Sequence, residues 1–311
     1  MRIAVTGATG FIGRHLVSRH LMIGDEVRVF GRRPAFQRGV QSFAGDLVTD
    51  TKYLPAFVDG ADVLYHCAGE LKKKPVMRLL HVNGTGNLAA AADRRIGRWV
   101  QLSSTGAYGT LRDGIIDEFT TTAPTGVYEK TKTEADELVE QASAAGAFSY
   151  AILRPSIVFG PDMPNQSLRQ LISVIARGFF LFIGPPGASA NYIYIDNVID
   201  ALIACATMPA AKDKVFNLSD YCTMEQFVRA IAMSMGKPMP QIRLPELPAR
   251  CIAHVLGRLS GFPLTVSRLN ALTSRARYPS TRIERQLGYV HRVSMEDGLR
   301  RMVESWRQGH V

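Results

Sequence analysis

The stretch Thr6-Gly7-Ala8-Thr9-Gly10-Phe11-Ile12-Gly13 decides the fold that we expect for this chain. Its glycines have GxxGxxG spacing, and they lie between the apolar, β-prone run at 3–6 and a stretch at 11–21 with apolar residues at helical spacing. Such glycines permit a tight turn and let backbone N–H groups approach a pyrophosphate at a helix N-terminus. The stretch therefore predicts a dinucleotide site, formed by Gly7, Thr9, Gly10, Phe11, Ile12 and Gly13.

The rest of the chain continues this alternation of strands and helices. Apolar runs at 27–30, 63–67, 99–102 and 150–153 are separated by stretches of helical character, such as 86–92 and 197–207. We therefore expect an α/β fold: a Rossmann-type doubly wound parallel sheet with a smaller, mostly helical C-terminal substrate domain. Local enrichment in Pro, Gly and Arg assigns the substrate domain to 161–190 plus 221–311, and the nucleotide-binding domain to 1–160 plus 191–220.

The composition is that of an ordinary soluble globular protein. Of the 311 residues, 46% are hydrophobic and 21% are charged. The four cysteines form no CxxC pair and have no metal-ligand spacing, so we expect neither a disulfide framework nor a metal site. The N-terminal residues lack the pattern of a signal peptide, and the apolar stretch at 174–186 is too short to cross a bilayer. We expect a cytoplasmic protein with no integral membrane segment.

The chain carries a net charge of +10, and the excess is concentrated at its end. From residue 241 onward there are twelve arginines and no lysine against five acidic residues. No nucleic-acid motif accompanies them, so we expect no nucleic-acid partner and interpret the segment as a solvated basic face. A phosphate-bearing substrate is the second interpretation.

The end of the second expected strand bears on the choice of cofactor. A fold that binds NAD places Asp or Glu there for the ribose hydroxyls, but this chain has Gly31 followed by Arg32 and Arg33. A guanidinium pairs with a 2′-phosphate, so the cofactor is NADP or NAD, with NADP favoured. Further candidates for cofactor contacts are Asp46 and Leu47, where a carboxylate could lie near the adenine, and Ala68 and Gly69, at the end of the expected strand at 63–67.

Tyr128 and Lys132 are the strongest candidates for catalysis. Their i, i+4 spacing puts the phenol and the ammonium on one face of a helix, whereas Lys130 points elsewhere. An adjacent ammonium and a cationic nicotinamide would lower the phenol pKa and let Tyr128 exchange a proton. Ser104 follows an expected strand, at the sheet edge where such folds bind ligands, and can hydrogen-bond the substrate oxygen. For His66 and His81 we favour structural roles.

Together these motifs resemble the extended short-chain dehydrogenase/reductase family, also called the epimerase/dehydratase family. The resemblance covers nearly the whole chain, from the glycine-rich turn through HCAG at 66–69, VNGTGN at 82–87, LSSTGAYG at 102–109 and YEKTK at 128–132 to LRPSIVFGP at 153–161 and YIYIDNVIDA at 192–201. It implies a catalytic Ser104, Tyr128 and Lys132. It also implies that Asn83 supports the active site and that Asn83 and Pro155 lie at the cofactor. Homodimers are frequent in this family, so we expect one here.

Four departures from the family pattern restrict the reaction. Gly31 replaces the acidic residue typical of epimerases that retain NAD, which favours a reductase that exchanges NADP(H). Ser156 replaces an asparagine common in nucleotide-sugar members, and Asn191 stands where many carry a phosphate-binding arginine. Thr105 and Gly106 follow Ser104 in place of the Asp-Glu pair of sugar dehydratases, so we do not expect dehydration.

Three functions remain open at this point. The first, which the sequence favours, is a 4-ketoreductase or epimerase for a nucleotide-activated sugar of the kind used in polysaccharide biosynthesis. The second is an NADP-dependent reductase of hydrophobic ketones, similar to 3β-hydroxysteroid dehydrogenases and dihydroflavonol reductases. The third is a non-catalytic NAD(P)-binding sensor or assembly subunit.

Overall fold

A seven-stranded sheet forms the centre of the protein in the computed structural model, which describes residues 1–33, 37–256 and 265–309. The strand order is β10-β6-β5-β4-β1-β2-β3, and every neighbouring pair is parallel. The strands are β1 (Arg2–Thr6), β2 (Glu26–Gly31), β3 (Val40–Ala44), β4 (Ala61–His66), β5 (Ile96–Leu102), β6 (Ser149–Pro155) and β10 (Lys214–Leu218). The expected doubly wound parallel sheet is confirmed.

Apolar side chains cover both faces of this sheet, as its central strands require. In β1, Ile3 and Val5 pack into one core cluster, whereas Ala4 packs into a second cluster on the opposite face. A parallel strand that is buried on both faces has a continuous apolar sequence, which is why β1 could be predicted from the sequence. The edge strand β3, with the sequence VQSFA, is largely exposed and was not expected as a strand.

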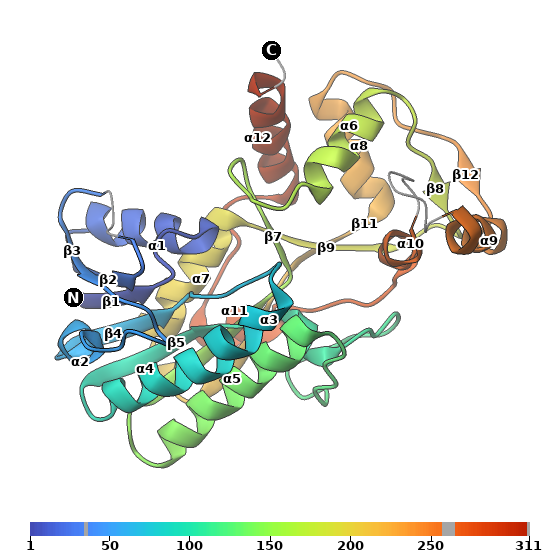
Figure 1. Ribbon diagram of the computed structural model, residues 1–311. Helices are drawn as coiled ribbons and strands as arrows, with labels where there is room; N and C mark the ends of the chain where they lie inside the picture. Colours follow the sequence, from blue (N-terminus) through green and yellow to red (C-terminus); the bar gives the residue numbers. More distant parts are fainter. Residues whose placement is uncertain (34–36, 257–264, 310–311) are drawn as a thin grey trace.

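Helices form a layer on each face of the sheet (Figure 1). One layer holds α1 (Phe11–Met22) and α7 (Ile195–Thr207), with α11 (Thr281–Leu287) packed against α7 and β10. The other holds α2 (Leu54–Val58), α4 (Gly84–Ala92) and α5 (Val127–Ala144), and α3 (Lys74–Arg78) packs against α5. A π-helical turn, η1 (Leu79–Asn83), joins α3 to α4, and a 3₁₀ turn, η2 (Thr105–Tyr108), follows β5.

Two small sheets extend beyond the central one. The first has the order β11-β9-β7 and contains β7 (Ile157–Phe159), β9 (Ser189–Tyr194) and β11 (Asp220–Thr223). The second pairs β8 (Phe182–Ile183) with β12 (Arg243–Leu244). The segment at 192–194 belongs to a small sheet, and the strand at the other edge of the central sheet is β10, which was not expected from the sequence.

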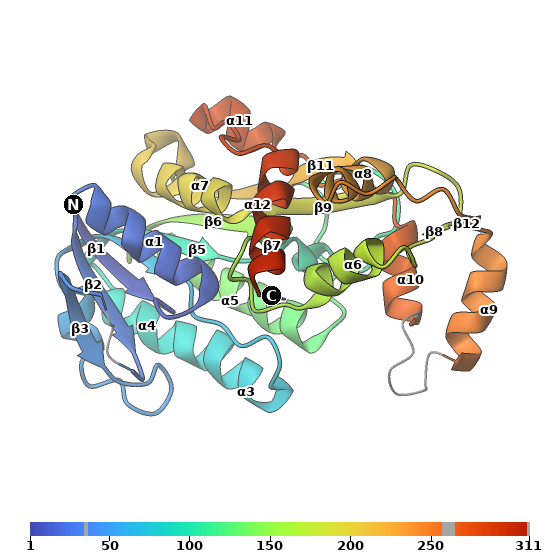
Figure 2. The ribbon, with the colours of Figure 1, turned by 90° about the horizontal axis from the view of Figure 1, so that it is seen from above.

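The remaining helices gather around these small sheets. They are α6 (Ser167–Ala176), α8 (Met224–Ser234), α9 (Glu246–Leu256), α10 (Val266–Thr273) and α12 (Met295–Gln308). Seen from above, β3 lies at one end of the molecule, and α9 and α10 lie at the other (Figure 2). The mostly helical C-terminal portion is confirmed, but α11 packs on the central sheet. The division of the chain into two domains at the expected boundaries stays a prediction.

A helix needs about 20 predominantly apolar residues to cross a bilayer. Within the described residues, no helix combines the length and the apolar character that a membrane span needs.

Candidate active site

The glycine-rich turn lies where the strand order reverses. β1 has β2 on one side and β4 on the other, and such a switch point is where open α/β sheets bind ligands. Gly7 has a φ of +70°, and a Cβ there would lie 2.6 Å from the backbone nitrogen of Ala68. A Cβ on Gly13 would collide with the carbonyl oxygen of Gly7. The turn therefore requires glycine, because it is packed directly against the loop after β4.

Helix α1 starts immediately after this turn and has an open N-terminus. Its N-cap, Gly10, offers no side-chain cap, and the first turn contains no acidic residue. Thr9 and Gly10 are exposed, while Phe11 and Ile12 are half-buried. Uncapped N–H groups with the positive end of a helix dipole suit a phosphate-bearing group, so this cradle fits the pyrophosphate of a dinucleotide.

The residues after β2 present a cation beside a carboxylate. The Arg32 side chain is 78% exposed, and its Nε lies 4.0 Å from Oδ2 of Asp46. Asp46 Oδ1 in turn accepts a hydrogen bond from the N–H of Val48 at 2.8 Å. Leu47, also expected at the cofactor, has its side chain buried in the core. Arg32 and Asp46 are thus brought together at the end of β2, whereas the Leu47 side chain is not part of that surface.

The two serines after β5 point in different directions. Ser103 is buried and donates a hydrogen bond to Asp136 Oδ2 at 2.6 Å. Ser104 is half-buried, and its Oγ caps η2 by accepting from the N–H of Gly106 at 3.1 Å. Consecutive residues of an extended chain face opposite sides, so only Ser104 lies on the open side of the strand end.

Helix α5 brings Tyr128 and Lys132 to the same strand end. Lys132 is buried, and its Nζ donates a hydrogen bond to the carbonyl oxygen of Leu102, the last residue of β5, at 2.6 Å. The first turn of α5 also touches η2, since a Cβ on Gly106 would lie 2.8 Å from Glu129 Cγ. Lys130 is exposed, as expected. Ser104, Tyr128 and Lys132 therefore gather where β5 ends.

Burial is the largest influence on the pKa of both Tyr128 and Lys132. It raises the pKa of Tyr128 to about 12, with smaller contributions from the charges of Glu129 and Asp136. Burial also lowers the pKa of Lys132, although Asp136 and Cys67 act in the opposite direction. The pKa of Tyr128 is therefore raised, and not lowered as expected from Lys132, because burial disfavours the charged phenolate. The phenol thus keeps its proton at neutral pH.

A buried polar cluster behind these residues escaped the sequence analysis. Asp136 Oδ2 accepts a hydrogen bond from Arg154 at 3.4 Å, Arg154 also donates to the hydroxyl of Tyr108 at 3.3 Å, and that hydroxyl donates to Asn217 at 2.9 Å. The cluster links α5, β6, η2 and β10. Its one sequence signal was an acidic residue four positions after Lys132, on the same helix face.

A second buried group that the sequence analysis set aside is His81. Its ring lies edge-on to that of Tyr128, with 5.6 Å between centroids and an interplanar angle of 83°. Asn83, which the resemblance assigned to the site, is exposed two residues later. Ala68 packs on the glycine-rich turn and Gly69 is exposed beside His81, while Pro155 is buried at the end of β6.

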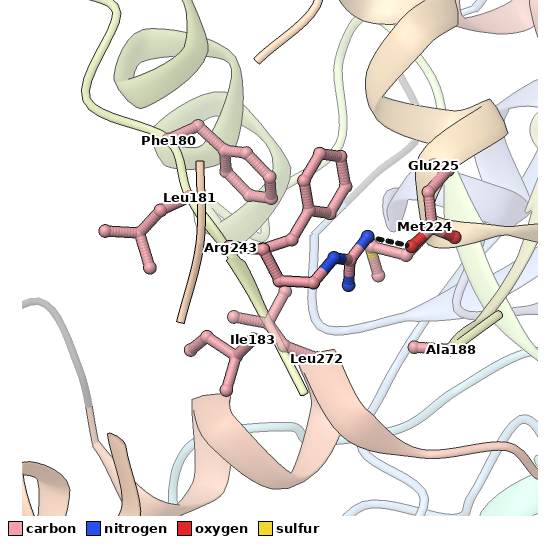
Figure 3. Close-up of a pocket in the computed structure, with 9 residues that line it drawn as sticks. Phe180, Leu181, Ile183, Ala188, Met224, Glu225, Arg243 and Leu272 are labelled. Atoms are coloured by element: carbon pink, nitrogen blue, oxygen red, sulfur yellow. Dashed lines mark hydrogen bonds and ion pairs between the residues drawn. The ribbon is translucent and has the colours of Figure 1, made fainter. Parts of the chain in front are cut away.

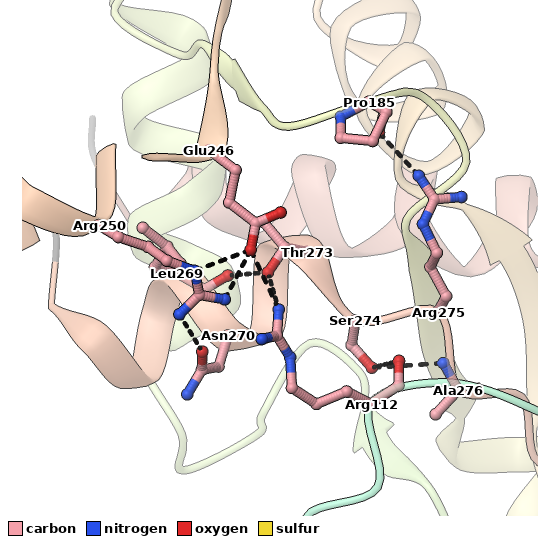
Figure 4. A network of polar contacts seen from close by, with 10 residues as sticks. All are labelled: Arg112, Pro185, Glu246, Arg250, Leu269, Asn270, Thr273, Ser274, Arg275 and Ala276. Atoms are coloured by element: carbon pink, nitrogen blue, oxygen red, sulfur yellow. Dashed lines mark hydrogen bonds and ion pairs between the residues drawn. The ribbon is translucent and has the colours of Figure 1, made fainter. Parts of the chain in front are cut away.

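The arginines near the chain end are mostly engaged by other protein groups. Arg112 and Arg250 both contact Glu246 Oε1, at 3.3 and 2.6 Å, and Arg275 donates to the carbonyl of Pro185 (Figure 4). Asn191 donates to the carbonyl of Ala276 at 2.8 Å. Further arginines with acidic partners are Arg243 with Glu225, Arg292 with Asp200, Arg300 with Asp297, and Arg301 with Asp196.

A protein metal site needs several His, Cys, Asp or Glu side chains close together. The residues that the structure describes contain no group of three or more His, Cys, Asp or Glu side chains able to hold a metal ion. The four cysteines are all free thiols.

Comparison with known proteins identifies relatives that span the chain. A UDP-glucose 4-epimerase of Vibrio cholerae is 26% identical over 99% of this chain and 96% of its own. A 4-hydroxy-2-methyl-3-oxo-4-farnesyl-3,4-dihydroquinoline-1-oxide ketoreductase of Stigmatella aurantiaca is 28% identical over 96% and 95%. The crystal structure of a UDP-glucose 4-epimerase from Thermotoga maritima matches all of both chains with a TM-score of 0.77 at 19% identity, which supports the fold.

A family model assigns the chain more directly. The model of the NAD dependent epimerase/dehydratase family matches residues 3–219, which include the glycine-rich turn, β5 and the first turns of α5. The non-catalytic alternative is therefore set aside. The chain belongs to the NAD dependent epimerase/dehydratase family and is an NAD(P)-dependent oxidoreductase or epimerase.

Proposed function

We propose that the protein is a reductase that interconverts a ketone and a secondary alcohol with exchangeable NADP(H), and that Tyr128 is its acid–base group. The observation that supports this most strongly is the meeting of Tyr128, Lys132 and Ser104 at the end of β5, where Lys132 Nζ is bound to the Leu102 carbonyl at 2.6 Å. When bound, NADPH supplies a hydride to the carbonyl carbon. The chain must then supply a proton to the carbonyl oxygen.

The protonation state of Tyr128 suits this reduction. Burial raises its pKa to about 12, so the phenol carries the proton that a developing alkoxide needs. As the C–O double bond becomes a single bond, that proton moves from the phenol to the oxygen. Ser104 donates a hydrogen bond to the same oxygen, and the Lys132 ammonium stabilises the phenolate left behind. The reverse sequence oxidises the alcohol.

Arg32 supports exchangeable NADP(H) over tightly retained NAD. Its exposed guanidinium stands directly after β2, with no acidic residue at Gly31 to repel a 2′-phosphate. Epimerisation needs an oxidised cofactor that stays bound through oxidation and re-reduction, whereas a reductase releases the spent cofactor. We therefore favour reduction over epimerisation.

For the substrate, we favour an apolar ketone because the arginines near β8 and β12 are engaged by other protein groups. The contact between β8 and α8 is packed mainly by aromatic and aliphatic side chains, among them Phe180 and Met224, and leaves no room for a water molecule, so a substrate does not bind inside it (Figure 3). Its one guanidinium, Arg243, is bound to Glu225 at 2.7 Å, and so is not a free phosphate ligand. The Stigmatella relative, whose name describes a farnesyl-bearing ketone, is consistent with this class.

A nucleotide-activated sugar is the second candidate. The match to the Vibrio UDP-glucose 4-epimerase over nearly the full length of both chains favours it. The guanidinium of Arg277, which stacks on Tyr221 in a cavity of about 390 Å³, is a candidate ligand for a diphosphate. A cytoplasmic homodimer is part of either proposal.

Two measurements test the proposed function. The nucleotide released from the purified, denatured protein is identified first; we expect little bound NAD⁺, and stoichiometric NAD⁺ would contradict the reductase. Absorbance at 340 nm is then followed with NADPH and either a 3-ketosteroid or UDP-4-keto-6-deoxyglucose. We expect turnover with the steroid. Turnover with the sugar nucleotide alone would favour the second candidate, and failure with a broad set of ketones would reject reduction.

A further inference from the structure

His81 is a buried histidine whose two ring nitrogens both have partners. Its side chain is 1% exposed, and it lies in the π-helical turn η1, a geometry that occurs often at functional sites. Nδ1 lies 2.8 Å from Thr131 Oγ1, on α5. Nε2 accepts a hydrogen bond from the backbone N–H of Glu70, in the loop after β4, at 2.9 Å. One imidazole therefore joins the catalytic helix to that loop.

These partners determine the tautomer of the ring. A backbone N–H only donates, so Nε2 must be bare and the proton must lie on Nδ1. Thr131 is free to accept that proton, because its own hydroxyl donates to the carbonyl of Val127 at 2.9 Å. The ring must also be neutral, since a proton on Nε2 would face another donor. Burial and the charge of Lys132 lower the pKa of His81 to about 4, against the opposing effect of Glu70.

The network continues through the fold to the glycine-rich turn. The Thr6 hydroxyl, one residue before Gly7, donates to His66 Nδ1 at 2.6 Å, and His66 Nε2 donates to Thr85 Oγ1 at 2.9 Å. Thr85 then donates to the His81 carbonyl. Along this path the Thr85 hydroxyl both accepts and donates, and each imidazole has one donor nitrogen and one acceptor nitrogen. The path thus runs without a gap from β1 through β4, α4 and η1 to α5.

Both ends of the His81 bridge matter for the reaction. The Glu70 end belongs to the loop that packs on the glycine-rich turn, through Ala68 and Gly7. The Thr131 end lies one turn along α5 from Tyr128, whose ring touches the imidazole. A shift of either end moves the phenol relative to the cofactor cradle, and a misplacement of about 1 Å can reduce a rate roughly 100-fold.

We propose that His81 is a positioning residue: as a neutral imidazole protonated on Nδ1, it holds the Tyr128 helix in register with the loop that closes on the glycine-rich turn. This inference rests on the proposed role of Tyr128. It assigns to His81 no proton transfer with substrate, because no hydrogen bond joins it to the phenol among the contacts of the described residues. The groups that face the ring are Lys132 and Tyr128 on α5, Glu70 on the loop, and His66 on β4.

The tautomer can be observed without any substrate. The full chain is labelled with ¹⁵N-histidine, and the His81 ring signals are assigned by their loss in His81→Gln. We expect the proton on Nδ1 and a bare Nε2 at pH 7. A proton on Nε2 would overturn the inference, because the Glu70 bond could not then exist.

Variants separate the two ends of the bridge. Thr131→Val keeps the shape of the side chain but removes its acceptor, so we expect kcat to fall about tenfold, with the Kd for NADPH within about twofold of the parent. His81→Gln can still accept from Glu70, and we expect it to spare NADPH affinity while kcat falls. His81→Phe loses both bonds, and we expect kcat to fall about 100-fold and NADPH to bind more weakly. Turnover is measured with the 3-ketosteroid and UDP-4-keto-6-deoxyglucose probes.

His20 provides a matched control. It is also buried, with Asp25 and Tyr65 as partners at 2.7 and 3.1 Å, but it contacts none of the site residues. We expect His20→Gln to lower stability while leaving kcat and NADPH affinity within about twofold. An equal loss of kcat in His20→Gln and His81→Phe, or a kcat for His81→Phe within about threefold of the parent, would contradict positioning. Retained turnover in Tyr128→Phe would reject the proposed function instead, and the tautomer measurement would then test only the hydrogen bonds of the His81 bridge.

Discussion

Charged side chains are buried at the end of β5, whereas in the region around β8 and β12 they are partly exposed. At the first, Lys132, Asp136 and Arg154 are buried. Arg154 is paired with Asp136, and Lys132 is bound to the carbonyl oxygen of Leu102. At the second, Arg112, Arg243 and Arg250 are partly exposed and paired with Glu225 or Glu246. Buried charges hold their geometry because leaving it exposes an unpaired ion to a poor solvent, whereas exposed pairs rearrange at little cost. The first region is therefore suited to catalysis and the second to adaptable recognition.

The largest effect that tests this contrast is the loss of the Tyr128 hydroxyl. We expect Tyr128→Phe to reduce kcat by about 10³-fold, because the proton donor is removed while the ring still packs against His81. The Kd for NADPH, measured by fluorescence, should stay within about twofold of the parent protein. A kcat near that of the parent would show that the end of β5 does not carry the reaction.

Removal of the buried carboxylate should have the next largest effect. Asp136→Ala leaves Arg154 buried without its carboxylate, which we expect to lower the free energy of unfolding by about 3–5 kcal/mol. Urea denaturation measures this change. Asp297→Ala breaks an exposed pair with Arg300 and serves as the control, for which we expect no measurable change. Similar losses in both variants would remove the proposed difference between the two regions.

Acid should weaken the catalytic region through its neutral histidine. The pKa of His81 is about 4 in the folded chain against 6.5 as its ordinary value, so the unfolded chain binds more protons between these pH values. Stability is then complete above about pH 6.5 and falls as the pH drops towards 4, by at most roughly 3 kcal/mol. Urea midpoints measured across this range test the prediction. His81→Gln should reduce the slope, and an unchanged slope would contradict it.

A smaller effect is expected at the exposed cofactor surface. Arg32→Ala removes the proposed partner of a 2′-phosphate, so we expect NADPH to bind about tenfold more weakly. NADH affinity should not change, because NADH has no phosphate at that position. Equal losses for both cofactors would indicate a general disturbance of the β2 end and not phosphate recognition.

The smallest effect should come from the arginine pairs of the second region. Glu246→Gln releases Arg112 and Arg250, and we expect the free energy of unfolding to change by less than about 1 kcal/mol. The same variant separates the substrate classes: freed arginines should lower the KM for UDP-4-keto-6-deoxyglucose if that compound binds here, and leave the KM for a 3-ketosteroid unchanged.

Local patterns were enough to predict which candidate catalytic residues lie at the end of β5, but not the groups that surround them. Tyr128 and Lys132 share a helix face, and Ser104 follows an apolar strand, so spacing alone brought them into one hypothesis. Asp136, Arg154, Tyr108 and Asn217 come from four elements and meet only after folding. His81 was set aside because a single histidine on a helix gives no signal of its partners. Asn83, favoured by the resemblance, faces outward in the π-helical turn.

The arginine-rich segment from residue 241 onward is a second case in which the sequence alone did not predict the side-chain partners. Its charge could be counted in the sequence, but some of the acidic partners lie far away in the chain, as with Arg292 and Asp200 or Arg301 and Asp196. The count alone left a phosphate-binding surface open as an interpretation. Only the pairing of side chains reduced the number of free cations.

Sequence alone determined the parallel sheet, the glycine-rich turn and the Tyr128–Lys132 face, because each follows from periodicity or spacing over a few neighbouring residues. Tertiary structure decided the strand order, the buried Asp136–Arg154 pair, the bridging role of His81 and the pairing of the arginines. These features depend on contacts between residues distant in the chain, whose burial and hydrogen-bond partners no local pattern records.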